Sequence, residues 1–196
     1  MSRPAMYPAV VLVRAAIEVA AAHGLEAVTI AAVGRQAGAP SGSIYHRFHS
    51  RDGLLAAAWL EATRAFQAGF LPALEDTHHA AGVAAARHTT DWARREPAAA
   101  RVLVLYRARD FGAARWTPGH RQEAGRLAAE LEEGLTAFSR RHLGDRGGEV
   151  RRRVTFALLD LPLAAVRRYL SAGIAPPPEV DRYLEETLRA LIPIGP

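Results

Sequence analysis

Apolar residues recur at spacings of three and four positions along most of this chain, which is the period of one face of an α-helix. Near the N-terminus such a stripe is formed by Val13, Ala16, Ile17 and Ala20. Near the C-terminus a wider stripe comprises Val180, Tyr183, Leu184, Thr187, Leu188, Leu191 and Ile192. Alternating runs of β-branched residues, which are typical of strands, are absent. The pattern predicts an all-α protein of about nine helices, with an N-terminal three-helix head and a larger helical body.

Small polar residues and glycines mark the ends of the first helices. Hydroxyl side chains accept bonds from the free N–H groups at a helix start, and glycine adopts the left-handed conformation that often ends a helix. The boundaries predicted on these grounds are a start near Pro8, an end at Gly24, caps at Thr29 and Ser41, an end at Gly38, and a cap at Ser50 with Asp52 in the turn that follows.

The rest of the chain predicts longer helices. They run from Leu54 to about Phe70 with an end at Pro72, from Glu75 to Arg95, from Glu96-Pro97 to about Arg107, from His120 to Leu143, from Glu149 to Ala172, and from about Glu179 to Leu191. The stretch from Asp110 to Gly119 contains glycine and proline and predicts a loop. Pro162 lies inside the predicted helix 149–172, where it should kink the helix or break its hydrogen-bond ladder.

The two short helices on either side of Gly38 predict a helix-turn-helix. In such a motif a glycine permits the tight turn, and small or apolar residues let the two helices touch. Ile30, Val33 and Ala37 would face inward, and Ile44 and Phe48 would anchor the second helix. The exposed positions of that helix would then face the major groove of DNA, where hydroxyl, imidazole, phenol and guanidinium groups can bind base edges and phosphates.

This segment resembles the DNA-binding domain of the tetracycline-repressor (TetR) family of one-component regulators over roughly residues 8 to 55. The matching residues are Gly24, Thr29, Ala37-Gly38-Ala39, Ser43-Ile44-Tyr45, Phe48, Ser50-Arg51-Asp52 and Leu54-Leu55. The resemblance implies phosphate contacts by Thr29, Tyr45 and Arg51, a base contact by His46, and a close approach to bases or backbone by Ser41, Gly42 and Ser43. Arg51 replaces the lysine usual in the family, and Gly34, Pro40 and Gly53 also depart from its pattern.

The resemblance further implies a helix-turn-helix domain at 1–52 and an effector-binding and dimerisation domain at 53–196. It implies a homodimer that reads a near-palindromic DNA operator and a repressor that a small-molecule effector releases. Repressor and activator are not separated by the sequence. The alternative is a helical small-molecule-binding protein or enzyme whose DNA-binding head is degenerate.

The predicted helix 149–172 has two apolar stripes, one of which includes Leu158 and Leu161 and the other Leu159 and Leu163. A helix that is apolar on two sides needs cover on both, and a second subunit can supply one of them. The expected dimer interface comprises Phe156, Leu159, Leu163, Val166, Tyr183, Leu184 and Leu188. The alternative is a helix that lies wholly inside a monomer.

Aromatic and polar residues of the middle helices are candidates for an effector pocket, because bulky apolar groups with a few polar tips suit a small, largely apolar ligand. These candidates are Phe66, Phe70, His88, Trp92, Tyr106, Trp116 and Phe138. The alternative for each of them is core packing.

Composition narrows the class of protein. The chain has 196 residues, 49% of them hydrophobic, with a net charge of +5 and 25 basic residues that are all arginine. Exclusive arginine together with abundant alanine is typical of a GC-rich genome, so basicity alone is weak evidence for nucleic-acid binding. No cysteine, nucleophile elbow, P-loop or HExxH motif is present, and we expect no catalytic activity and no cofactor.

Three further expectations concern surroundings and ligands. No stretch approaches the roughly 18 apolar residues of a membrane span, and Arg14 interrupts the only apolar run near the start, so we expect a cytoplasmic protein. His78, His79 and His88 raise the question of a metal, but adjacent histidines on a helix point about 100° apart and we expect none. Arg3 could reach a minor groove, although a frayed terminus is the simpler expectation.

Overall fold

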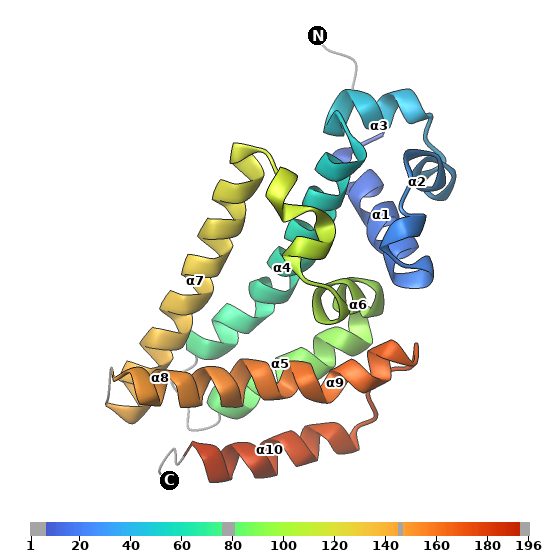
Figure 1. Cartoon of the computed structure of the whole chain (residues 1–196). Helices are drawn as coiled ribbons and strands as arrows, with labels where there is room; N and C mark the ends of the chain where they lie inside the picture. The colour runs from blue at the N-terminus through green and yellow to red at the C-terminus, as the bar shows by residue number, and fades with distance from the viewer. Residues whose placement is uncertain (1–6, 76–80, 145–146, 193–196) are drawn as a thin grey trace.

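The computed structural model of the chain describes residues 7–75, 81–144 and 147–192. These residues form helices joined by short turns, and no strand occurs among them. Nine helices result when the continuous stretch 148–171 is counted once, which confirms the predicted all-α fold with an N-terminal helix-turn-helix head. In Figure 1 the head lies at the upper right and the C-terminal helix at the bottom.

The head consists of α1 (Ala9–His23), α2 (Ile30–Ala37) and α3 (Ser41–Phe48), with a 3₁₀ turn at Leu25–Ala27 between the first two. Its core is formed by fully buried aliphatic side chains, among them Leu12, Val33 and Ile44. Removal of such side chains from water is the main source of stability for short helices, because helices of this length are marginal alone. The steep packing of α2 and α3 thus depends on this shared core.

Two of the three predicted caps are present. The Thr29 hydroxyl accepts a bond from Ala32 N at 3.1 Å, and the Ser50 hydroxyl accepts one from Gly53 N at 3.0 Å. The prediction that Ser41 caps α3 is wrong, because Pro40 is the N-cap residue and Ser41 is the first helical residue. The extended backbone of Pro40 (φ −65°, ψ 143°) suits that position, and its carbonyl accepts the bond from Ser43 N at 3.0 Å.

Gly34 and Gly53, two departures from the family pattern, lie where the backbone approaches most closely. A Cβ at position 34 would lie 2.8 Å from the Ala39 carbonyl oxygen, and one at position 53 would lie 2.3 Å from the Phe48 carbonyl oxygen. Real Cβ atoms do not come so close to backbone, so both sites require glycine or a shift of the chain. The two glycines therefore permit the tight junctions α2–α3 and α3–α4.

Helix α4 (Arg51–Glu75) runs from the head through the length of the body, as Figure 1 shows. The prediction that it ends at Pro72 is wrong, because the proline lies inside the helix and three residues follow it. Pro72 is exposed, so the carbonyl that loses its helical partner can be hydrated. The predicted domain boundary at 52/53 falls within the first turn of α4, so one rigid element belongs to both parts.

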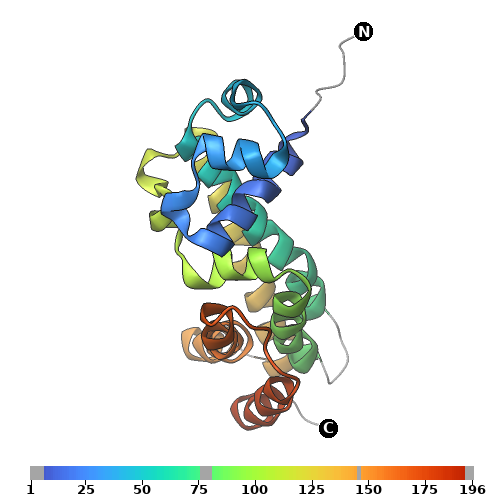
Figure 2. The same ribbon diagram turned by 90° about the vertical axis from the view of Figure 1, so that its right-hand side faces the viewer.

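The body adds α5 (Ala81–Arg95), α6 (Pro97–Leu105), α7 (Pro118–Leu143), α8 (Gly148–Thr155), α9 (Leu161–Ser171) and α10 (Glu179–Leu191). Helix α6 lies between head helix α1 and body helix α9, and α10 packs on α5 at the end opposite the head (Figure 2). The predicted loop 110–119 contains 3₁₀ turns at Ala108–Phe111 and Ala113–Arg115, and α7 begins at Pro118 rather than His120. The helix predicted to reach Arg107 ends at Leu105.

The stretch 148–171 stays helical through Pro162, but its regular hydrogen-bond ladder is interrupted there, as the sequence predicted. A π-turn at Phe156–Asp160 joins α8 to α9, and its first and last residues keep right-handed helical dihedrals. The Leu161 N–H donates to the Phe156 carbonyl, five residues back. Since proline has no N–H to offer the Leu158 carbonyl, the ladder is already incomplete here, and a wider turn accommodates the gap. Asp160, the residue before α9, is exposed and its side chain makes no capping bond.

Candidate nucleic-acid interface

The outer face of α3 carries the residues that the sequence assigned to DNA. Tyr45 is 53% exposed, and Ser41, Gly42, His46 and Arg47 are also exposed. Ser43 is half-buried, and Thr29 at the start of α2 is exposed although its hydroxyl also caps that helix. Nothing lies within 4 Å of a Cβ placed at Gly42, so the first turn of α3 is open to a partner. Four of the residues that the sequence assigned to DNA, namely Ser41, Gly42, Tyr45 and His46, are therefore exposed on one short helix.

The charge of this surface favours a polyanion. From Ala27 to Arg51 the chain contains no acidic residue, whereas it contains Arg35, Arg47, Arg51 and two histidines. Protein contacts to DNA are dominated by cationic and neutral donors that bind phosphates. A stretch free of carboxylates on the exposed face of the second helix of a helix-turn-helix is the arrangement that such binding needs.

Arg51 differs from the expectation, because its guanidinium is engaged within the head. Its Nε donates to the Val28 carbonyl at 2.6 Å and its Nη2 donates to the Leu25 carbonyl at 2.7 Å. These bonds tie the first turn of α4 to the segment between α1 and α2. Two of its N–H groups therefore hold the motif in shape, and a phosphate contact by Arg51, which stays a prediction, would use the others.

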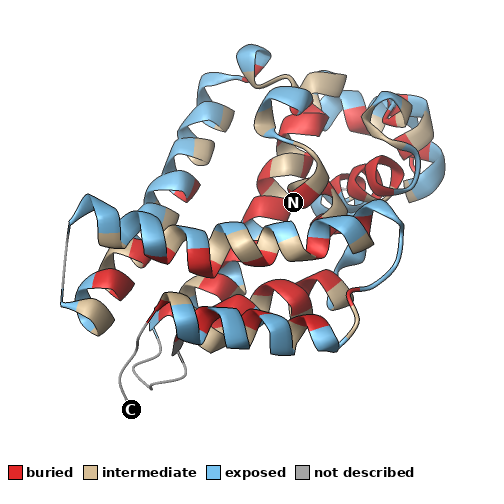
Figure 3. Ribbon diagram, turned by 60° about the horizontal axis from the view of Figure 1, so that its bottom comes forward, coloured by how far each residue is buried: buried red, intermediate tan, exposed pale blue. Residues whose placement is uncertain are grey.

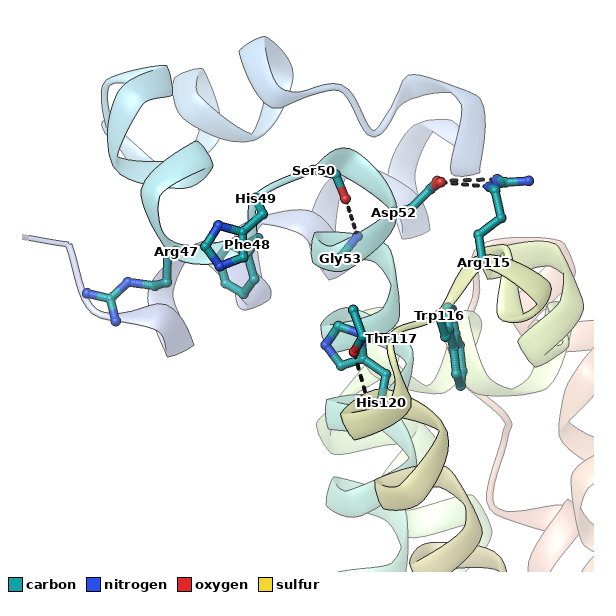
Figure 4. Close-up of a pocket in the computed structure, with 10 residues that line it drawn as sticks. All are labelled: Arg47, Phe48, His49, Ser50, Asp52, Gly53, Arg115, Trp116, Thr117 and His120. Carbon is teal, nitrogen blue, oxygen red and sulfur yellow. Dashed lines mark hydrogen bonds and ion pairs between the residues drawn. The ribbon is translucent and has the colours of Figure 1, made fainter.

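The turn between α3 and α4 is unusual and well defined. His49 ends α3 in the left-handed conformation with φ +60°, and its N–H donates to the Tyr45 carbonyl at 2.9 Å. A pocket of about 240 Å³ lies beside this turn, between the end of α3 and the start of α7 (Figure 4). In Figure 4 Arg47 points away from the other side chains, toward the outside of the head.

An ion pair crosses from head to body beside this pocket. Arg115 Nε donates to Asp52 Oδ2 at 2.7 Å, and the two side chains point toward one another in Figure 4. The hydrogen bond from Arg115 holds the pKa of Asp52 below its ordinary value, against the opposing effect of partial burial. Because Arg115 is largely exposed, this pair contributes little stability, but it fixes where the head meets the segment before α7.

The seven candidates for an effector pocket lie in four separate places. Phe66 packs against Phe70, His88 and Trp92, with ring centroids 5.1, 5.4 and 5.3 Å away respectively. The remaining rings pair as Tyr106 with Phe111 at 6.1 Å, Phe138 with His142 at 4.5 Å, and Trp116 with Trp59 at 5.5 Å. Of the seven, His88 and Trp92 line one cleft, of about 750 Å³, whose walls come from α1, α4, α5 and α6.

The seven candidates for a dimer interface divide into two groups. Phe156 and Tyr183 are 50% and 53% exposed, and Leu159 and Leu163 are half-buried. Val166, Leu184 and Leu188 are at most 4% exposed within one chain, so most of their surface is already covered by its core. A groove of about 350 Å³ between α9 and α10 is lined by Tyr183 and Leu184 of the predicted set, together with residues that include Ala164, Ala165, Tyr169 and Thr187.

Other expectations concern ligands and membranes. Among the described residues no three histidine or acidic side chains gather in a way that could hold a metal ion. Within the same ranges no helix combines the length and apolar character needed to cross a membrane. His78, His79 and Arg3 lie outside the described residues.

Comparisons with known proteins agree with this geometry. The family model described as bacterial regulatory proteins, tetR family, matches residues 12–58, which cover α1 to the first turns of α4. No curated protein matches the chain.

Solved structures share the whole fold at low sequence identity. A TetR-family regulator from Rhodococcus RHA1 has a TM-score of 0.70 at 21% identity, with 100% of both chains covered. PfmR from Thermus thermophilus has a TM-score of 0.69 at 16% identity, and the match covers 93% of this chain and 97% of PfmR. FadR from Bacillus subtilis, in complex with stearoyl-CoA, has a TM-score of 0.70 at 15% identity, and the match covers 94% of this chain and 98% of FadR.

Proposed function

Because the chain belongs to the tetR family of bacterial regulatory proteins and is a DNA-binding regulator, we propose that it is a homodimeric repressor of transcription that a small molecule releases from its operator. The single observation that carries this proposal is the exposed face of α3, which presents Tyr45, His46 and Arg47 in a stretch without any carboxylate. On this proposal the protein works beside its DNA in the cytoplasm and catalyses no reaction.

Assembly as a dimer is supported by the face that α9 and α10 leave open (Figure 3). Phe156 and Tyr183 are large apolar or amphipathic side chains that stay half exposed in one chain, and the groove between the helices lies beside Tyr183. Pairing of two such faces about a two-fold axis would cover them. The two heads would then be related by the same axis, and their operator would be an inverted repeat.

Release by a small molecule is supported by cavities of suitable size and by the neighbours. The structure of Bacillus subtilis FadR contains stearoyl-CoA, and that of the multidrug-binding protein EbrR contains imidazole. In this chain the cleft that His88 and Trp92 line has a volume of about 750 Å³. That volume lies within the usual range of sites for drug-sized ligands.

DNA binding is tested by footprinting on the DNA upstream of the gene, at several salt concentrations. Arg47→Ala is compared with Arg140→Ala, because both arginines are exposed but Arg140 lies on α7, in the body. If Arg47 binds phosphate, its removal should weaken binding at all sequences and reduce the slope of log affinity against log salt by about one. Arg140→Ala should leave the slope unchanged.

Tyr45→Ala and His46→Ala complete the experiment. Tyr45→Ala should reduce affinity for specific and unrelated DNA alike, whereas His46→Ala should reduce the preference for the specific site. A protected site that neither variant alters would refute the assignment of α3 as the recognition helix. Absence of any salt-sensitive binding would favour a ligand-binding protein with a degenerate head.

A further inference from the structure

We propose that the effector binds in the cleft between head helix α1 and body helices α4, α5 and α6, and that it is a small, neutral, mainly apolar molecule which donates a hydrogen bond to His88. This inference rests on the proposed function and names the site and the ligand class for it. The cleft has a volume of about 750 Å³, and residues of the head and of the body line it together.

Small and apolar side chains make the walls of the cleft. Helix α4 contributes Ala65, Ala68 and Gly69, and α6 contributes Ala98, so neither helix fills the space with its own side chains. Helix α1 contributes Ile17 and Val10, and Val10 is 62% exposed. An apolar residue left in water at the mouth of a cleft with small apolar walls favours an apolar ligand body.

Charged residues at the rim do not demand a charge on the ligand. Three glutamates and two arginines line the cleft, and the glutamates are Glu18, Glu61 and Glu96. Two of these carboxylates already have partners, since Gln36 Nε2 donates to Glu18 at 2.7 Å and Arg64 donates to Glu61. Because the charges around the cleft are of both signs and two of the carboxylates are already paired, the cleft has no strong electrostatic field of either sign. This favours a neutral ligand.

His88 provides the polar recognition. Its Nε2 lies 2.9 Å from the Phe66 carbonyl oxygen, and a carbonyl can only accept, so Nε2 carries the hydrogen. Burial lowers the pKa of His88, and so does nearby Arg95, while the Phe66 carbonyl and Asp91 act in the opposite sense. The ring is therefore neutral near pH 7, and the remaining nitrogen, Nδ1, is an acceptor.

Gly69 places that acceptor at the wall of the cleft. A Cβ at position 69 would lie 2.2 Å from His88 Cε1 and 2.7 Å from His88 Nδ1, so only glycine lets the imidazole lie against α4. Gly69 and His88 both line the cleft. The ring thus lies against α4, where the Phe66 carbonyl accepts its hydrogen bond and the bare backbone of Gly69 leaves room for it, and both contacts fix its orientation before a ligand arrives.

The position of the cleft gives a direct route to the head. Helix α1 belongs to the head, so a ligand that separates α1 from α4 and α6 changes how the head sits on the body. Arg101 on α6 opposes this, because its guanidinium donates to the Ala21 carbonyl in α1 at 2.9 Å and also to the Leu170 carbonyl in α9. If the displaced arrangement binds DNA less well, thermodynamic linkage requires that the ligand and the operator weaken each other's binding.

Two matched probes test the ligand class: 2-naphthol, which can donate a hydrogen bond, and 2-methoxynaphthalene, which cannot. Binding to the full-length protein without DNA is measured by titration calorimetry and probe fluorescence at pH 7. We expect 2-naphthol to bind about three- to tenfold more tightly than its methyl ether, the factor that one net hydrogen bond supplies. Equal affinity of the two probes, or no binding of either, would overturn the proposal.

Variants locate the site. His88→Phe should abolish the preference while leaving 2-methoxynaphthalene binding within about twofold, and His88→Gln should restore part of the preference through its amide oxygen. Ala65→Trp fills the cleft and should remove binding of both probes, whereas Ala128→Trp, at an exposed position of α7, should not. Circular dichroism confirms that each variant is folded, and unchanged probe binding in Ala65→Trp would refute the location.

Operator binding is then measured separately, with and without saturating 2-naphthol. The probe should weaken operator binding in the natural chain and in Ala128→Trp but have no effect in Ala65→Trp. If the probes bind as expected but no operator is found, the cleft stands and the proposed function fails. If an operator is bound but the probes do not bind, the proposed function stands and the cleft fails.

Discussion

Arg94 is the residue whose removal should most directly test how α10 is held on the body. Its guanidinium donates to both carboxylate oxygens of Asp181 at 2.9 Å, to Asp91 at 3.0 Å, and to the carbonyls of Pro176 and Pro177 at 2.9 and 3.2 Å. The side chains of Arg94 and Asp181 are 24% and 16% exposed. One side chain therefore fixes the proline-rich connector and the first turn of α10 at once.

Arg94→Met keeps the aliphatic stem and removes every donor. Loss of one partner from a buried ion pair costs about 3–5 kcal/mol, because the other charge is left without a partner. Partial exposure lets water solvate Asp181 and the two carbonyls, so we expect a smaller loss, about 2–3 kcal/mol. For a chain of this length that corresponds to a fall in Tm of about 4–12 °C.

The assay is urea unfolding and thermal unfolding at one protein concentration, since dimer stability depends on concentration. Arg182→Met is the matched control, because Arg182 lies on α10 itself, is 63% exposed, and meets Glu186 at 3.4 Å. Such a surface pair should contribute at most about 0.5 kcal/mol. A double-mutant cycle of Arg94→Met with Asp181→Leu should give a coupling free energy of unfolding above about 1 kcal/mol. Equal costs for the two arginine variants, or an additive cycle, would show that α10 is held by its apolar face alone.

Three further predictions concern other parts of the fold. Gly53→Ala should lower stability by about 1–3 kcal/mol in thermal unfolding, because its Cβ would lie 2.3 Å from the Phe48 carbonyl oxygen, whereas Gly42→Ala meets open space and should not destabilise. Burial alone would raise the pKa of Asp181, but its hydrogen bonds, Arg94's the largest, outweigh this and hold the pKa below its ordinary value. The resulting stability is therefore present above the ordinary aspartate pKa and should be lost as pH falls below about 4, which denaturation of wild type and Asp181→Asn across that range would show. Arg101→Met removes donors to carbonyls in the C-terminal turns of α1 and α9, so amide hydrogen exchange should accelerate in both turns and not in α3.

Local features of the sequence predicted the head well. The caps at Thr29 and Ser50 were predictable because a cap depends on residues three positions apart. The role of Arg51 was not, because its partners are carbonyls more than 20 positions earlier, and only the folded head brings them within reach. The departure at Gly53 also depends on the fold, because a Cβ there would meet the carbonyl oxygen of Phe48 at the end of α3.

The effector candidates show a different limit. Aromatic composition identified side chains in the middle helices, but apolar bulk serves core packing and pocket lining equally well. What distinguishes His88 from Phe138 is the residue opposite it. Gly69 and Ala65 leave space beside His88, while Phe138 is fully buried against His142. A cleft is defined by the small residues that face it, and their positions become clear only when two helices are placed together.

The π-turn explains why the dimer interface was only partly predictable. The buried positions of this stretch are Val154, Ala157, Leu158, Pro162, Val166 and Leu170, and all of them except Ala157 follow one another at intervals of four residues. On a regular helix four such steps would rotate the line of side chains by about 160°, and the extra residue of one π-turn removes about 100° of that rotation. A single line can therefore face the core from end to end. The second stripe inferred for a regular helix is divided at the turn, so that Phe156 at its start is half exposed while Val166 after it is buried. The open face thus owes its make-up to the missing N–H of one proline.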